Sequence, residues 1–191
     1  MELLFATNNL HKLEEVQLLI GSDFTIKSFS DLGFSEDVPE TGNTFEANAS
    51  QKTHFIFDRF KMNCFADDSG LEIDALNGEP GVYSAHYSGS RDFQENINLV
   101  LEKLKHSLNR KARFKTVISL MFNNHEYFFE GVAEGEITME ASGKDGFGYD
   151  PIFMPEGYGI TFAEMNLKEK NRISHRAKAI KKMILFLKGK V

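Results

Sequence analysis

Apolar and polar residues follow two different periods along this chain, and the two periods predict an alternation of strands and helices. Residues 3–6 are a short apolar run followed by polar residues, which is typical of a buried strand, and residues 24–29 are predicted as a second strand. Between them, residues 12–20 carry apolar side chains at helical spacing and end before Gly21. The chain therefore opens with a predicted strand, helix and strand, as many α/β proteins do.

Three later segments also have helical spacing, and each begins at a capping signal. One helix begins near Asn43 or Thr44, another follows Asp92 with Glu95, and the last follows Ser174. The apolar faces of these helices comprise Phe45, Ala49 and Ile56; Ile97, Leu101, Leu104 and Leu108; and Ala177, Ile180, Ile184 and Leu187. We expect these faces to point inward.

Alternation with a period of two marks the predicted strands of the middle of the chain. Residues 112–137 alternate on both sides of a turn at Asn123-Asn124, which predicts a long antiparallel hairpin. Residues 71–75 alternate as a half-buried strand does, and residues 78–81 have the composition of a turn. Together with the helices, these strands predict an α/β fold with a mixed sheet.

Two adjacent carboxylates, Asp67 and Asp68, interrupt an otherwise apolar extended run and are followed by Ser69 and Gly70. The two adjacent carboxylates repel each other, and we expect a break in the backbone here, at a strand junction. Both features are typical of a functional site. Since neighbouring residues of an extended chain point to opposite faces, we expect the two side chains to have different roles. The alternative is an Asx-type turn whose carboxylates only accept backbone N–H bonds.

Length and composition indicate a globular protein of the reducing cytoplasm. The 191 residues suffice for one full core, so we predict one domain over residues 1–191. No apolar run approaches the roughly 20 residues of a membrane span, the N-terminus has no signal-peptide pattern, and the lone Cys64 has no partner for an internal disulfide. The net charge of −6 argues against binding to extended nucleic acid.

Two places gather groups suited to a small anionic ligand. The polar break Thr7-Asn8-Asn9 precedes a helix with Lys12 in its first turn, which is the layout of a phosphate site, although a solvated Lys12 is the alternative. The cations Lys170, Arg172, His175 and Arg176 crowd the start of the last helix. Because cations favour the other end of a helix, this cluster indicates an anionic or acceptor-rich ligand.

The loop of residues 143–151 places Phe147 between two glycines. Glycines free the backbone around the aromatic ring, so the loop is costly to order unless it shapes a surface. The ring would suit a planar ligand, and the alternative is a core phenylalanine that plugs the loop.

Five segments, in this order along the chain, give it a family resemblance: residues 5–12, 66–71, 80–85, 146–151 and 173–176. They resemble the motifs of the inosine/xanthosine triphosphate pyrophosphatase family. The resemblance implies hydrolysis of ITP, dITP and XTP to the nucleoside monophosphate and pyrophosphate with Mg²⁺. It also implies a two-lobed α/β fold around an elongated mixed sheet, an active-site cleft between the lobes, and a homodimer.

The same resemblance assigns roles to single residues. Asp68 corresponds to the general base, and Glu40 and Asp68 to the metal ligands. The expected phosphate contacts are Thr7, Asn8, Asn9, Leu10, His11, Lys12 and Lys52, and the expected nucleoside contacts are Ser69, Phe147, Gly148, Tyr149, Asp150, Lys170, His175 and Arg176. Asn8 and His86 depart from the family pattern, which has glycine and arginine there.

Chemistry agrees with these assignments. Cleavage of the α–β phosphate bond needs an oriented water and charge neutralisation on the leaving pyrophosphate, which a carboxylate, Mg²⁺ and lysines supply. A 6-oxopurine presents acceptors at O6 and N7, which match donors on Lys170, His175 and Arg176. Two alternatives stay open: a non-catalytic nucleotide sensor, and a pyrophosphatase of related fold acting on modified guanine or pyrimidine triphosphates.

Overall fold

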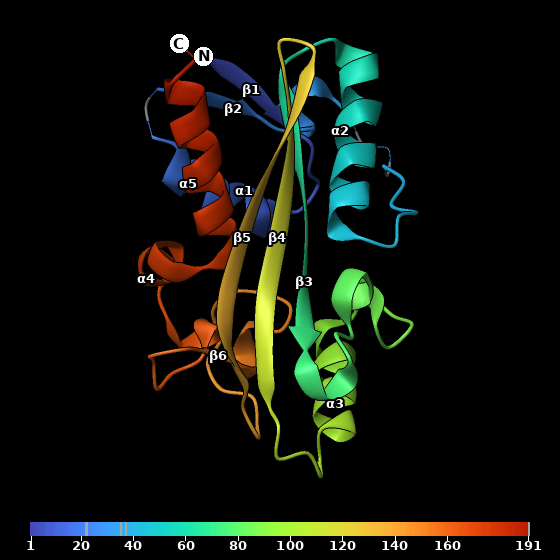
Figure 1. Ribbon diagram of the computed structural model, residues 1–191, viewed down its shortest axis with the longest axis vertical. Helices are drawn as coiled ribbons and strands as arrows, with labels where there is room; N and C mark the ends of the chain where they lie inside the picture. The colour runs from blue at the N-terminus through green and yellow to red at the C-terminus, as the bar shows by residue number, and fades with distance from the viewer. Residues whose placement is uncertain (22, 35, 37, 191) are drawn as a thin grey trace. The chain divides into compact units, whose positions relative to one another are not determined.

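The computed structural model describes residues 1–21, 23–34, 36 and 38–190. Within these residues, the strands form one six-stranded sheet in the order β2-β1-β3-β4-β5-β6, with helices beside it (Figure 1). The strands are β1 Glu2–Phe5, β2 Thr25–Lys27, β3 Cys64–Ile73, β4 Lys111–Phe122, β5 His125–Ile137 and β6 Phe153–Pro155. The helices are α1 Leu10–Ile20, α2 Phe45–Phe60, α3 Phe93–Lys103, α4 Leu167–Ile173 and α5 His175–Lys188.

The sheet is mixed, which confirms the predicted fold class. Strand β1 pairs in parallel with both β2 and β3, whereas β5 pairs with β6 in antiparallel orientation. The turn between β4 and β5 lies at Asn123 and Asn124, whose φ angles of 50° and 63° are those that a tight hairpin turn requires.

Contacts within the chain divide it into two compact units. Unit 1 comprises residues 1–68, 116–131 and 176–191, and unit 2 comprises residues 69–115 and 132–175. Strands β3, β4 and β5 contribute residues to both units. The division agrees with the two lobes that the resemblance implies, while the cleft and the single domain stay predictions.

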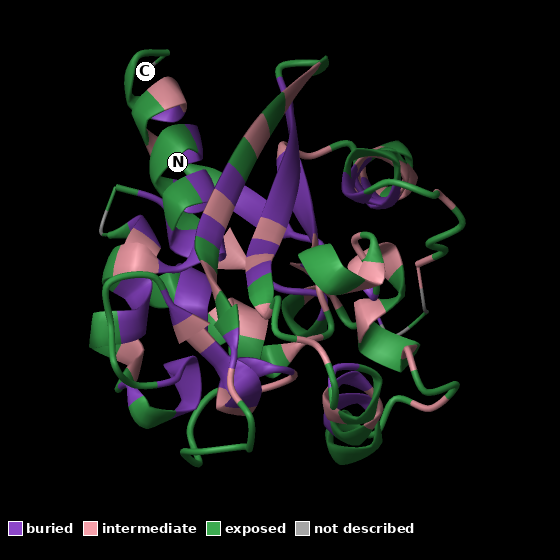
Figure 2. Ribbon diagram, turned by 60° about the horizontal axis from the view of Figure 1, so that its bottom comes forward, coloured by how far each residue is buried: buried purple, intermediate pink, exposed green. Residues whose placement is uncertain are grey.

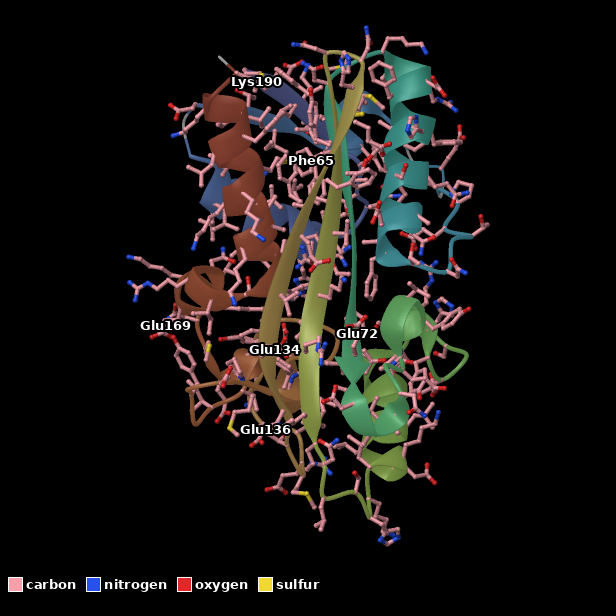
Figure 3. The ribbon with its side chains drawn as sticks, viewed as in Figure 1. Phe65, Glu72, Glu134, Glu136, Glu169 and Lys190 are labelled. Atoms are coloured by element: carbon pink, nitrogen blue, oxygen red, sulfur yellow. The ribbon has the colours of Figure 1, made fainter. Side chains whose placement is uncertain are left out.

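Unit 1 has a core on each face of its part of the sheet. Along β1, Leu3 and Phe5 pack with residues of α1 and α5, while Leu4 packs with Ile56 of α2. On β3, the ring of Phe65, which Figure 3 labels, stacks on Phe5 with ring centroids 4.5 Å apart. The alternation of side chains along each strand therefore gives α1 and α5 one face and α2 the other.

Unit 2 has a single core on one face of its strands. Leu71, Phe114 and Ala133 of the strands pack there with Ile97 and Val100 of α3. Exposed glutamates stand on the same strands, among them Glu134 and Glu136 of β5 (Figure 3). Helices α3 and α5 each bury one stripe and expose the other, as their apolar periods predict (Figure 2).

Three local expectations were wrong. Strand β3 runs without interruption through Asp67 and Asp68, so there is no backbone break at this pair. Strand β2 spans only three residues, because the flanking Phe24 and Phe29 pack as core residues outside the ladder. Leu108 is 102% exposed, because α3 ends at Lys103.

The predicted starts of α2, α3 and α5 were right, whereas α1 begins at Leu10, two residues before the expected start at Lys12. Thr44 and Asp92 are the N-caps of α2 and α3, with side chains that accept from Ala47 N and Glu95 N. Helix α4, which the apolar pattern did not predict, ends immediately before α5 at its C-cap Ser174. Among the helices of the described residues, none combines the length and the apolar composition needed to cross a membrane.

Candidate functional site

Asp67 and Asp68 lie on β3, between β1 and β4, and their side chains have different partners. Asp67 Oδ1 accepts from Lys12 Nζ at 3.0 Å, and Asp67 Oδ2 accepts from Arg176 Nε at 3.1 Å. Asp68 Oδ2 instead accepts from Asn48 Nδ2 of α2 at 2.9 Å. Because α1 and α5 cover one face of the sheet and α2 the other, the alternation of an extended strand explains this division.

A buried chain of charges surrounds Asp67. Arg176 Nη1 donates to the carboxylate of Glu15 on α1, so that Glu15, Arg176, Asp67 and Lys12 form a connected row. Burial alone would lower the pKa of Arg176, but the charges of Glu15 and Asp67 outweigh it and raise that pKa. Two carboxylates therefore balance two cations in this row.

Lys52 of α2 joins the backbone of β3 to the loop before α2. Its Nζ donates to the carboxylate of Glu40 and, at 2.7 Å, to the carbonyl of Asp67. The Lys52 side chain is 9% exposed, whereas that of Glu40 is 45% exposed. Lys52 is thus a buried group with two acceptors, while Glu40 faces solvent in part.

Burial raises the pKa of Asp68 above its ordinary value, in spite of Lys52, Lys12 and the hydrogen bond from Asn48, which lower it. The negative charge of Glu40 adds to the rise. A carboxylate with a raised pKa is a stronger proton acceptor than a solvated one. Asp68 therefore has the electrostatic setting of a general base.

The start of α1 has the geometry of a capped helix N-terminus. Asn9 is the N-cap, and its Oδ1 accepts from Lys12 N at 3.2 Å, while Thr7 Oγ1 accepts from Asn9 N at 3.1 Å. Burial lowers the pKa of Lys12, and Asp67 opposes this shift. The side chain of Leu10 is exposed, and Asn8 and His11 lie in the same segment.

The glycine loop of unit 2 is built around Phe147. Gly146 and Gly148, with φ of 76° and 61°, flank it. Asp150 Oδ2 accepts from Phe147 N at 2.8 Å and from Lys170 Nζ at 2.6 Å. Since Asp150 and Lys170 are both buried, this ion pair fixes the loop and leaves the Phe147 ring half-buried.

Lys170 lies close to Phe147 as well as to Asp150. Its Nζ is 5.1 Å from the centroid of the Phe147 ring, within the range of a cation–π contact. His175 is also buried, and its ring stacks on Phe114 with centroids 4.7 Å apart. Lys170 and His175, two of the predicted nucleoside contacts, are thus held within unit 2 by side-chain contacts.

Tyr149 is buried, and its hydroxyl donates to the carbonyl of Ser84 at 3.0 Å. Burial raises the pKa of Tyr149 above its ordinary value, so this hydroxyl stays protonated further into the alkaline range than that of an exposed tyrosine. Ser84 Oγ in turn accepts from Leu71 N at 2.9 Å. The contacts connect the glycine loop to β3 within unit 2, and Ser69 lies at the start of this unit on the same strand.

The structure assigns the predicted site residues to two groups. Unit 1 contains Thr7, Asn8, Asn9, Leu10, His11, Lys12, Glu40, Lys52, Asp68 and Arg176, and unit 2 contains Ser69, Phe147, Gly148, Tyr149, Asp150, Lys170 and His175. Their binding and catalytic roles stay predictions. Arg176, expected to meet the purine, donates to Glu15 and Asp67 in this structure.

Sequence reasoning missed Glu15, Asn48 and Ser84. Two of them carried a signal: Glu15 stands three residues after Lys12 beside the apolar stripe of α1, and Asn48 stands four residues before Lys52 on α2. Residues at these spacings share one side of a helix. Ser84 lay inside a quoted motif, but nothing local indicated its partners.

The whole chain is similar to known proteins. A model of the Ham1 family matches residues 3–186. A curated dITP/XTP pyrophosphatase of Flavobacterium psychrophilum is 48% identical over 190 residues, covering 99% of this chain and 100% of that protein. One of Porphyromonas gingivalis is 45% identical over 188 residues, covering 97% of each.

Solved structures extend the similarity to the fold. The Ham1 protein of Staphylococcus aureus superposes with a TM-score of 0.91 at 39% identity, covering 100% of both chains. A HAM1 protein from Coxiella burnetii gives a TM-score of 0.90 at 39% identity, covering 99% of both chains. The similarity therefore includes all of the segments that carry the site residues.

Proposed function

The chain belongs to the Ham1 family, and from this premise we propose that it hydrolyses dITP, ITP and XTP to the nucleoside monophosphate and pyrophosphate. The names of the curated relatives support the substrate class. The observation that carries the proposal is Asp68, a buried carboxylate with a raised pKa. It stands next to Asp67, to which both Lys12 and Lys52 donate hydrogen bonds.

In the proposed reaction, Asp68 takes a proton from the attacking water. The water oxygen bonds to the α-phosphorus, and the bond from that phosphorus to the bridging oxygen breaks. Pyrophosphate leaves with the electron pair of that bond, and the two lysines of unit 1, Lys12 and Lys52, offset its charge. Asn48 holds the carboxylate of Asp68 in place through its amide.

We propose that Glu40 and Asp68 hold Mg²⁺. Lys52 Nζ donates both to the carboxylate of Glu40 and to the carbonyl of Asp67, the neighbour of Asp68, which supports a site formed by the two carboxylates. Among the described residues, no group of three or more His, Cys, Asp or Glu could hold a metal. Since Mg²⁺ favours one or two carboxylates together with phosphate oxygens and water, this donor set fits it. Bound there, Mg²⁺ would neutralise phosphate charge.

For the nucleoside, we propose that Phe147 stacks on the purine and that Lys170 and His175 donate hydrogen bonds to its acceptor atoms. The fixed loop supports this role, because a ring held by its backbone loses little freedom on binding. We also propose a homodimer of the cytoplasm that acts on free nucleotides rather than nucleic acid. The family resemblance supports the homodimer, and the net charge of −6 supports free nucleotides over nucleic acid as substrates.

A substrate panel tests the proposal. Purified protein with Mg²⁺ is given dITP, XTP, dGTP, dATP, dCTP and dTTP, and the products are separated by ion-exchange chromatography. We expect dITP and XTP to yield pyrophosphate and the monophosphate, with dATP turned over far more slowly. Release of orthophosphate and dIDP would contradict the mechanism, and a preference for a pyrimidine or for guanine would contradict the substrate class. Addition of EDTA should abolish the activity.

A further inference from the structure

Phe93 is an exposed aromatic residue with no place in the core of unit 2. It is the first residue of α3, it is 47% exposed, and it is absent from the buried cluster of this unit, all of whose residues the structure describes (Figure 1). Its ring lies beside that of Phe147, with centroids 6.5 Å apart and planes at 47°. Rings at this separation count as an aromatic pair.

The backbone that carries Phe93 is held in place. Asp92, the N-cap of α3, accepts from Glu95 N at 3.0 Å. The buried Asn96 accepts from Ser88 N at 2.7 Å and donates to the carbonyl of Ser90 at 3.3 Å. Because the helix start is anchored on both sides of Phe93, the ring is presented from a defined position.

Phe147 is equally well anchored, through its amide and Asp150. The pair therefore has two fixed backbones and two ring planes that differ in orientation. A planar group stacked between two rings needs about 3.5 Å on each side, or roughly 7 Å between ring centres. The observed 6.5 Å is close to that spacing, and rotation of the exposed Phe93 ring about its side-chain torsions would bring the planes toward parallel.

We propose that Phe93 is a second wall for the purine base, which stacks between Phe93 and Phe147. This inference rests on the proposed function, since it concerns the base of the same substrate. It makes Phe93 a determinant of base affinity that does not touch the reacting phosphates. Stacking on an aromatic residue also explains why an apolar ring stays exposed at the start of a helix.

The test is Phe93→Ala, assayed for KM and kcat with dITP. Loss of one stacking wall should raise KM at least about fivefold, the low end of the effect of removing a stacked aromatic, while kcat stays within about twofold. Phe93→Tyr keeps the ring and should behave as the wild type, and Phe93→Leu should fall between. Tyr158→Ala is the matched control, because Tyr158 is 46% exposed in the same unit, and it should leave KM unchanged.

A binding measurement isolates the base. Isothermal titration with dIMP should show weaker binding to Phe93→Ala, whereas deoxyribose 5-phosphate, which has no base, should bind both proteins alike. An active wild type with a Phe93→Ala KM within twofold of its own would overturn this inference. A wild type that does not hydrolyse dITP would instead overturn the proposed function. If Phe93→Ala melts at a lower temperature than the wild type, the KM values of Phe93→Leu and Phe93→Tyr are compared instead.

Discussion

At the scale of single residues, Asp67 and Asp68 show how one strand serves two purposes. The extended backbone predicts that they face opposite sides, and the sequence suffices for that. It does not reveal the partners, because Lys12, Asn48 and Arg176 come from helices far away in the chain. Asp67 lies among charges that balance it, whereas Asp68 is a desolvated carboxylate with an amide partner.

Asp68→Asn should lower turnover of dITP by at least about 10²-fold, because it removes the proton acceptor while keeping the shape. The melting temperature should stay equal or rise. A raised pKa means that folding disfavours the charged form, and the neutral amide removes that cost. Turnover and thermal melting are measured on the same preparation, and near-normal turnover by a stable variant would contradict the assignment.

The neighbouring change, Asp67→Asn, is the matched control. It removes the carboxylate that pairs with both Lys12 and Arg176 and leaves these cations buried, so the free energy of unfolding should fall by about 3–5 kcal/mol, the usual loss on breaking a buried ion pair. Urea unfolding measures this difference. Equal stability of the two variants would mean that the charges around Asp67 do not hold the fold.

At the scale of elements, local signals predicted more than long-range ones. The N-cap of α3 was predicted correctly and that of α2 was narrowed to two residues, because a cap is a contact between residues three apart. The break expected in β3 was wrong for the opposite reason. Two adjacent carboxylates repel each other in the bare sequence, but Lys12 and Arg176 offset this in the fold, and the strand pairs with β1 and continues.

The glycine loop is an element whose geometry is testable. In Gly146→Ala, the added Cβ would lie 2.1 Å from Asp150 Oδ2, at a φ of +76°. Asp150 would have to leave Lys170 and Phe147 N, so KM for dITP should rise roughly tenfold. Separately, the strained backbone should lower the free energy of unfolding by about 1–3 kcal/mol. Steady-state kinetics and melting temperature measure the two effects.

Gly148→Ala separates strain from contact. Gly148 also has a positive φ, of +61°, but a Cβ there meets nothing within 4 Å. It should therefore lower stability by a similar strain and change KM much less. Equal KM values for the two variants would show that the bond between Asp150 and Phe147 does not position the ring.

At the scale of the whole molecule, the sequence predicts the layers and the resemblance implies two lobes, but the bounds of the two units were not predicted. Helical and strand periods identified a mixed sheet with helices, and Ham1 structures superpose on it with a TM-score of about 0.9. The boundaries at residues 68–69 and 175–176 fall inside the motifs themselves. No composition change marks them, because the division depends on where contacts gather along three long strands.

Global stability should depend on one thiol at high pH. Cys64 lies at the start of β3 with no exposed surface, and burial raises the pKa of its thiol from 9.0 to about 12. Between these values the unfolded chain loses the thiol proton and the folded chain keeps it. The contribution of this thiol to the free energy of unfolding is therefore fully present below about pH 9. It decreases by about 1.4 kcal/mol per pH unit as the pH rises toward the pKa of the folded state.

Cys64→Ala isolates that contribution from the lysines and tyrosines that titrate in the same range. Urea unfolding at pH 9.5, 10.5 and 11.5 should show a steeper loss of stability for the wild type than for the variant. The native thiol should also react slowly with Ellman's reagent at pH 8 and rapidly in urea, because reaction requires a thiolate that burial suppresses. Parallel slopes for the two proteins, or rapid reaction in the native state, would mean that Cys64 is open to solvent and that this end of β3 is less tightly packed than the rest of the core.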